Sequence, residues 1–100
     1  MVNLKPLQKK IWKNKVKKGF NITNIDREFN FLYSEVSEAF QAYRKKLPDI
    51  GEELADVAIY LLGLAEMLNI DLGKQIVKKM GKNKKRIYKV IKGVTTRVKG

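Results

Sequence analysis

Apolar residues recur every three or four positions in four segments of this chain, which is the pattern of amphipathic helices. The first predicted helix spans residues 6–18 and ends at Gly19. The second begins after Asn24, whose side chain can cap it, and runs to about Lys45, before the break at Pro48. The apolar stripe of this second helix consists of Ile25, Phe29, Leu32, Val36, Phe40 and Tyr43.

Two further helices are predicted after this break. Asp49 and Glu52 resemble a capping box that opens a third helix reaching to about Leu68. Twelve of the 15 residues in 54–68 are apolar and lie on nearly all sides of the helix, so we expect this helix to be central and buried. Asp71 is expected to cap the fourth helix. The apolar face of the fourth helix is formed by Leu72, Ile76, Met80, Ile87 and Ile91.

These elements predict an all-α fold, a four-helix antiparallel bundle. Strand signals are weak, and Thr95 and Thr96 are expected in an irregular C-terminal tail. We therefore expect one helical domain over residues 1–92 and a basic tail over residues 93–100. Four helices in 100 residues cannot easily cover all the apolar surface of the third helix, so we expect a homodimer or homotetramer.

The chain contains no cysteine and no histidine. This composition excludes disulfides, thiolate nucleophiles, catalytic triads with a histidine base, and zinc sites built on sulfur or imidazole. Any metal site must therefore use oxygen ligands, which select hard cations such as Mg²⁺, Mn²⁺ or Ca²⁺.

The net charge of +12 is unevenly distributed along the chain. Residues 1–25 carry seven lysines and no acid, and residues 72–100 carry eleven lysines and arginines and no acid. All ten acids lie between Asp26 and Asp71. The basic ends make a nucleic-acid-binding helical module an alternative reading. Specific nucleic-acid binding is nevertheless not expected, because the acidic middle would repel a polyanion and no helix-turn-helix pattern is present.

Neither a signal peptide nor a membrane span is expected. The first 20 residues scatter lysines among their apolar positions, and the most apolar stretch, 54–68, is short and contains Asp56 and Glu66. We therefore expect a soluble cytoplasmic protein.

Four carboxylates stand in two pairs on consecutive helices. Glu35 and Glu38 share one face of the second helix, and Glu53 and Asp56 share one face of the third. Antiparallel helices can bring the two pairs together, where carboxylates about 6 Å apart would repel by roughly 3 kcal/mol per pair at an effective dielectric constant of 20. A fold retains such a cluster when a cation neutralises it, so these four side chains are the candidate metal ligands.

The spacing of these acids resembles that of MazG-type nucleoside triphosphate pyrophosphohydrolases, which pair a Glu-x-x-Glu motif with a later Glu-x-x-Asp motif. Here Glu35-Val-Ser-Glu38 is followed, after fourteen residues, by Glu53-Leu-Ala-Asp56. The segments LYSEVSEAFQAYRK and GEELADVAIYLLGLAEMLNIDL are similar to the two metal-binding helices of that family, and the likeness covers roughly residues 7–88. Ser34 departs from the pattern, since the family often has Glu at that position.

The resemblance implies Mg²⁺-dependent cleavage of (deoxy)nucleoside triphosphates to monophosphate and pyrophosphate, with a role in cleaning the nucleotide pool. Mn²⁺ could replace Mg²⁺. Glu38, Glu53 and Asp56 would be metal ligands, and Glu35 would be either a fourth ligand or the general base. A catalytically silent paralogue that senses nucleotides is the alternative within the same family.

Further residues are expected to contact the substrate: Trp12, Tyr60, Lys79, Asn83 and Arg86. The last three match the family's Lys-x-x-x-Asn-x-x-Arg segment, and Lys79 and Arg86 would offset the charge of a triphosphate. Tyr60 lies one turn after the second acidic pair, where the family has an aromatic residue near the nucleotide. Trp12 either stacks on the base or packs the first helix against another subunit.

Overall fold

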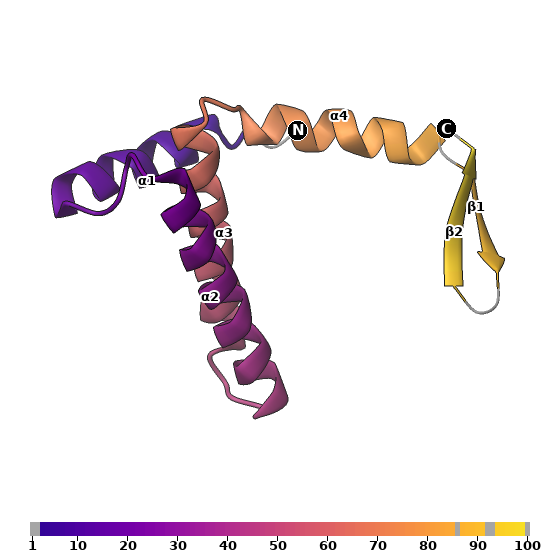
Figure 1. Cartoon of the computed structure of the whole chain (residues 1–100), viewed down its shortest axis with the longest axis horizontal. Helices are drawn as coiled ribbons and strands as arrows, with labels where there is room; N and C mark the ends of the chain where they lie inside the picture. The colour runs from indigo at the N-terminus through magenta and orange to yellow at the C-terminus, as the bar shows by residue number, and fades with distance from the viewer. Residues whose placement is uncertain (1–2, 86, 92–93, 100) are drawn as a thin grey trace.

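The computed structural model describes residues 3–85, 87–91 and 94–99. In chain order its elements are α1 (Lys5–Lys18), α2 (Ile25–Arg44), α3 (Ile50–Met67), α4 (Leu72–Lys85), β1 (Ile87–Ile91) and β2 (Val94–Lys99). Helices α2 and α3 lie side by side as an antiparallel hairpin, and α1 packs against α3 (Figure 1). The four helices make up most of the described chain, which confirms the all-α class.

Local capping signals set three helix boundaries, as the sequence predicts. Gly19 ends α1 in the left-handed conformation, with a φ of 70° that a residue without a Cβ adopts at low cost. Asn24 precedes α2, and its Oδ1 accepts the backbone N–H of Arg27 at 3.0 Å. The Oδ1 of Asp71 accepts the backbone N–H of Lys74 at 3.2 Å and so caps α4.

The start of α3 departs from the prediction in one respect. The helix begins at Ile50, directly after Asp49, but the side chain of Asp49 makes no capping hydrogen bond, so the expected capping box is wrong. Its Oδ1 is buried without a hydrogen-bond partner among the described residues. After burial, the charge of Asp49 is the largest cause of the raised pKa of Glu53, which places Asp49 beside the acidic side chains of α2 and α3.

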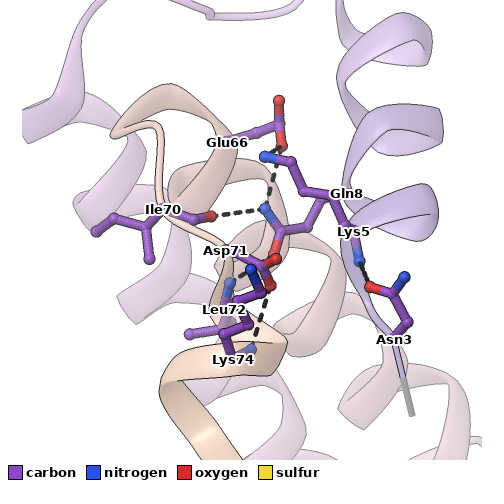
Figure 2. Close-up of polar contacts among 8 residues, drawn as sticks. All are labelled: Asn3, Lys5, Gln8, Glu66, Ile70, Asp71, Leu72 and Lys74. Carbon is purple, nitrogen blue, oxygen red and sulfur yellow. Dashed lines mark hydrogen bonds and ion pairs between the residues drawn. The ribbon is translucent and has the colours of Figure 1, made fainter.

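The junction between α3 and α4 is held by a buried glutamine of α1 (Figure 2). The Nε2 of Gln8 donates to the carbonyl oxygen of Ile70 at 2.9 Å and to Oε1 of Glu66 at 3.1 Å. Its Oε1 accepts the backbone N–H of Leu72 at 2.9 Å. Lys5 adds an ion pair to Glu66 at 2.9 Å. One side chain thus joins α1 to the end of α3, the turn and the first residue of α4.

Helix α4 runs away from the other three helices and ends at Lys85 (Figure 1). The expectation that Ile87 and Ile91 continue its apolar face is wrong, because both lie in β1, which pairs with β2 in an antiparallel hairpin. A separation of four residues fits one face of a helix but also one face of a strand, so the spacing does not separate the two. Thr95 and Thr96, expected in an irregular tail, lie in β2. The division of the chain at residue 92 stays a prediction.

Over residues 3–85, the buried apolar core is small. Its buried apolar residues come from α2 and α3 and are Ala39, Ala42, Leu62, Leu64 and Ala65. The predicted apolar stripe of α2 is largely uncovered, with exposed fractions that rise from 37% at Phe29 to 70% at Tyr43. The expected burial of α3 holds at residues 62–65, whereas Leu54 and Leu61 are exposed. The buried apolar residues of α2 are therefore small alanines, whereas the large apolar side chains of its predicted stripe are mostly exposed.

Candidate metal centre and the adjoining cavity

Three of the four predicted carboxylates converge between α2 and α3. Glu35 and Glu38 from α2 and Glu53 from α3 each offer an oxygen atom, and these atoms lie within 4.8 Å of one another. The i, i+3 spacing on α2 brings the first two together, and the antiparallel pairing of the helices adds the third.

Two of these carboxylates carry an unsatisfied buried oxygen. Oε2 of Glu35 and Oε2 of Glu53 are removed from solvent, and neither has a hydrogen-bond partner among the described residues. Burial raises the pKa of the Glu35 carboxyl, and the neighbouring Glu38 raises it further. Partial burial is also the largest cause of the raised pKa of Glu53, followed by the charge of Asp49. Such a set of crowded, unpartnered oxygens fits a hard divalent cation, which would neutralise the repulsion.

Asp56, the fourth predicted ligand, lies beside this group rather than within it. Its side chain is exposed, and its charge raises the pKa of both Glu35 and Glu53. It also lines the cavity described next, so it stands between the carboxylate cluster and that cavity. Asp49 is the acid that the sequence analysis missed, because it was assigned to a capping role.

A cavity of about 720 Å³ opens between α1, the loop after it, α2 and α3. Three cations line it, namely Lys10, Lys15 and Arg27. None of them was predicted as a substrate contact. The only sequence signal for them was the lysine-rich first segment of the chain, which does not say which of its lysines turn inward.

An ion pair buried between α1 and α2 forms part of the cavity wall. Lys15 Nζ bonds to Oε2 of Glu28, and the side chains are only 9% and 1% exposed. Oε1 of Glu28 accepts the amide N–H of Asn21 at 3.1 Å. The lysine also lies 6.0 Å from the ring centroid of Tyr60, within the range of a cation–π contact. The pair therefore links the loop that follows α1 to the wall of the cavity.

Tyr60, the predicted aromatic contact, lines this cavity together with Phe31. The two rings meet edge to face, with centroids 6.1 Å apart, and the Arg27 guanidinium lies 5.6 Å from the Phe31 centroid. Burial and then the charge of Glu35 raise the pKa of the Tyr60 hydroxyl. Trp12 is half-buried on α1 and is not among the residues that line the cavity.

Two of the three predicted phosphate contacts of the fourth helix lie apart from this site within one chain. Lys79 and Asn83 lie on α4, where they line a shallow hollow with Ile76 and Met80. Figure 1 shows α4 extending away from the α2–α3 hairpin that holds the carboxylates. Arg86 lies outside the described residues.

Fold and site together define an all-α protein in which a carboxylate cluster, able to hold a metal ion, adjoins a cavity between helices. The model of the MazG-like family matches residues 18–98, which is most of the chain, so the chain belongs to this family. No curated protein and no solved structure matches the chain. Membership indicates a function of the nucleotide pyrophosphatase type and the use of a divalent metal. Among the described residues, no helix is both long and apolar enough to cross a membrane.

Proposed function

We propose that this protein hydrolyses (deoxy)nucleoside triphosphates to the monophosphate and pyrophosphate, acting on the cytoplasmic nucleotide pool. The convergence of Glu35, Glu38 and Glu53 within 4.8 Å, beside a cavity of nucleotide size, carries the proposal. Family membership supports the reaction type.

The carboxylates would hold Mg²⁺, with Mn²⁺ as a substitute. Glu38, Glu53 and Asp56 are proposed as ligands, because each side chain is placed at or beside the cluster. A divalent ion there supplies Lewis acidity and neutralises phosphate charge. Glu35 either completes the ligand set or accepts a proton from the attacking water, and its partly buried carboxyl suits either role.

The cavity would receive the nucleoside. Its aromatic wall of Tyr60 and Phe31 offers apolar surface for a base, and Lys10, Lys15 and Arg27 supply positive charge near the acidic site. A triphosphate carries about four negative charges, which carboxylates would repel unless cations intervene. Asp56 lines the cavity, so a bound nucleotide could extend from the aromatic wall to the carboxylates. Trp12 does not line the cavity, so base stacking by this residue stays a prediction.

We further propose that the protein works as a homodimer or homotetramer. Phe29, Val36 and Phe40 expose a continuous apolar stripe on α2, and Leu54 and Leu61 add exposed surface on α3. A second copy would cover these stripes by packing α2 and α3 against their equivalents, which would complete a bundle across two chains. Sedimentation or light scattering at micromolar concentration would decide this, and a stable monomer would contradict it.

The test of activity is a panel of canonical and modified triphosphates, incubated with Mg²⁺ or with chelator and resolved by chromatography. We expect monophosphate and pyrophosphate only when Mg²⁺ is present. Glu53→Gln should abolish turnover, whereas Glu52→Gln, a matched change at the exposed neighbouring residue, should preserve it. Release of orthophosphate and diphosphate would contradict the assigned bond. Binding without turnover would favour the nucleotide-sensing paralogue.

A further inference from the structure

Lys15 is a buried lysine at the wall of the cavity. Its aliphatic stem lies on α3 at Gly63, where an added Cβ would come within 3.4 Å of Cδ of the lysine. Its ammonium bonds to Glu28 and lies 6.0 Å from the ring centroid of Tyr60, and the side chain is only 9% exposed. Lys15 and both neighbours of its ammonium line the cavity, so a ligand that fills the cavity contacts this lysine.

The ammonium of Lys15 has hydrogen-bond donors that the chain does not use. A lysine ammonium carries three N–H donors. Among the described residues, Oε2 of Glu28 is the acceptor that Lys15 finds. The remaining two donors are largely shielded from water, and a buried donor without an acceptor is costly. A ligand that presents an acceptor to Lys15 therefore gains a hydrogen bond that neither water nor the chain supplies.

Glu28 determines which kind of acceptor suits this lysine. The glutamate balances the charge of Lys15, and Asn21 holds its other carboxylate oxygen with a hydrogen bond of 3.1 Å. A phosphate brought to this ammonium would also approach the carboxylate, which would repel it. A neutral carbonyl oxygen accepts the hydrogen bond without that repulsion. Glu28, at 1% exposure, is itself sealed from the ligand, so it acts as a positioning residue for Lys15.

The place of Lys15 along α3 assigns the carbonyl to the nucleobase. Tyr60 and Gly63 follow Glu53 of the carboxylate cluster by about two and three helical turns, so the lysine crosses α3 roughly 10–15 Å from the cluster. That span corresponds to the reach of a nucleoside from its phosphates. Phosphates held at the carboxylates thus leave the base at the aromatic wall of Tyr60 and Phe31, beside Lys15.

Nucleobases differ in the group that they would present to this lysine. Guanine and hypoxanthine carry a carbonyl oxygen at position 6 of the purine, and uracil and thymine carry one at position 4 of the pyrimidine. Adenine and cytosine carry an amino group at these positions. An amino group that faces an ammonium brings donor against donor and leaves both unpaired. The lysine can therefore distinguish oxo bases from amino bases.

We infer that Lys15 selects oxo bases: it donates a hydrogen bond to the carbonyl oxygen at position 6 of a purine or position 4 of a pyrimidine, and Glu28 holds it in place for that contact. Nucleotides of guanine, hypoxanthine, uracil and thymine are then preferred over those of adenine and cytosine. The inference rests on the proposed function, because it names the nucleotides that the proposed reaction takes.

Two pairs of triphosphates that differ at this position test the selection in the wild type. Inosine triphosphate is compared with ATP, and UTP with CTP, each in the presence of Mg²⁺. We expect kcat/KM to be at least about tenfold higher for the oxo member of each pair, because the amino member leaves a buried donor unpaired. Equal values within either pair, or a preference for the amino member, would overturn the inference.

Variants separate selection by Lys15 from a structural role of the ion pair. Lys15→Met/Glu28→Leu removes both charges, so it leaves no buried carboxylate without its cation. A structural defect lowers activity on both members of a pair and keeps their ratio, whereas we expect the ratio to fall to near one.

Lys10→Met is the matched control, because Lys10 is an exposed lysine of α1 that also lines the cavity. It should lower kcat/KM alike for both members of a pair and keep the ratio of the wild type. A wild-type ratio in the double variant, or a ratio near one in Lys10→Met, would overturn the assignment to Lys15.

Binding of monophosphates keeps failure of the inference separate from failure of the proposed function. Titration calorimetry with IMP, AMP, UMP and CMP requires no turnover. We expect the oxo member of each pair to bind the wild type at least about tenfold more tightly, and both members to bind Lys15→Met/Glu28→Leu alike. If no triphosphate is hydrolysed but this selectivity is found, the proposed reaction fails and the base site stands. If triphosphates are hydrolysed but the monophosphates bind without selectivity, the reaction stands and the inference fails.

Discussion

Lys15 of α1 and Glu28 of α2 form an ion pair that is almost wholly removed from solvent, with side chains 9% and 1% exposed. Asn21 donates a further hydrogen bond to the same glutamate at 3.1 Å. The pair ties α1 to the helical hairpin at the wall of the cavity, so both stability and substrate binding should depend on it.

Removal of one partner of this pair should be strongly destabilising. Lys15→Met leaves Glu28 buried without its cation, and such a loss costs about 3–5 kcal/mol of the free energy of unfolding. The double variant Lys15→Met/Glu28→Leu removes both charges and should be more stable than the single variant. Lys5→Ala, which breaks the more exposed pair with Glu66, is the comparison and should cost under about 1 kcal/mol. Urea unfolding monitored by circular dichroism measures all three, and equal effects at the two pairs would contradict the expectation.

Neutralising one carboxylate of the cluster should not destabilise the metal-free protein. Burial and the charge of Asp49 raise the pKa of Glu53, so Glu53→Gln relieves an unfavourable charge and should leave the apo protein as stable or more stable. Mg²⁺ should raise the melting temperature of the wild type, because binding only to the folded state adds roughly 2.7 kcal/mol at a hundredfold excess over Kd. The melting temperature of Glu53→Gln should rise much less on addition of Mg²⁺. An equal Mg²⁺ shift in Glu53→Gln and wild type would place the metal elsewhere.

The pair between Lys5 and Glu66 should give a pH-dependent contribution to stability. The hydrogen bond from Lys5 holds the pKa of Glu66 below its usual value of 4.5, so the carboxylate stabilises the fold above that pH. This contribution is lost as pH falls below 4.5 and through the lowered pKa of the folded state. The wild type should therefore exceed Glu66→Gln in unfolding free energy at neutral pH, and the difference should shrink on acidification. A difference that is constant from pH 7 to acid would show that the charge of Glu66 contributes nothing.

The basic ends should bind duplex DNA only weakly. Because the exposed lysines of α4 neutralise phosphates without reading bases, the affinity should fall steeply with salt and show no sequence preference. Fluorescence anisotropy with two unrelated duplexes, at low and physiological salt, measures this. A submicromolar, sequence-selective complex at physiological salt would favour the nucleic-acid-binding alternative.

Helix boundaries and the faces of single helices could be predicted from the sequence alone. Gly19, Asn24 and Asp71 act within one helical turn, so their signals placed helix boundaries without knowledge of the rest of the fold. The i, i+3 spacing of Glu35 and Glu38 likewise fixed their common face, since helix geometry is independent of tertiary context. The same local reasoning was wrong at Asp49, whose side chain makes no capping hydrogen bond and whose charge instead acts on Glu53.

Contacts between distant residues were decided only by the tertiary structure. The sequence around Lys15 does not distinguish it from the neighbouring lysines. Its ion-pair partner Glu28 lies on α2, and the cavity forms only where α1, α2 and α3 come together. The start of α4 is joined to α1 by a hydrogen bond between Gln8 and Leu72, which are 64 positions apart. Helix α4, which carries Lys79, runs away from the α2–α3 hairpin that holds the carboxylates (Figure 1). Helical periodicity places a side chain on a face, but the partner of that face depends on how the chain brings remote segments together.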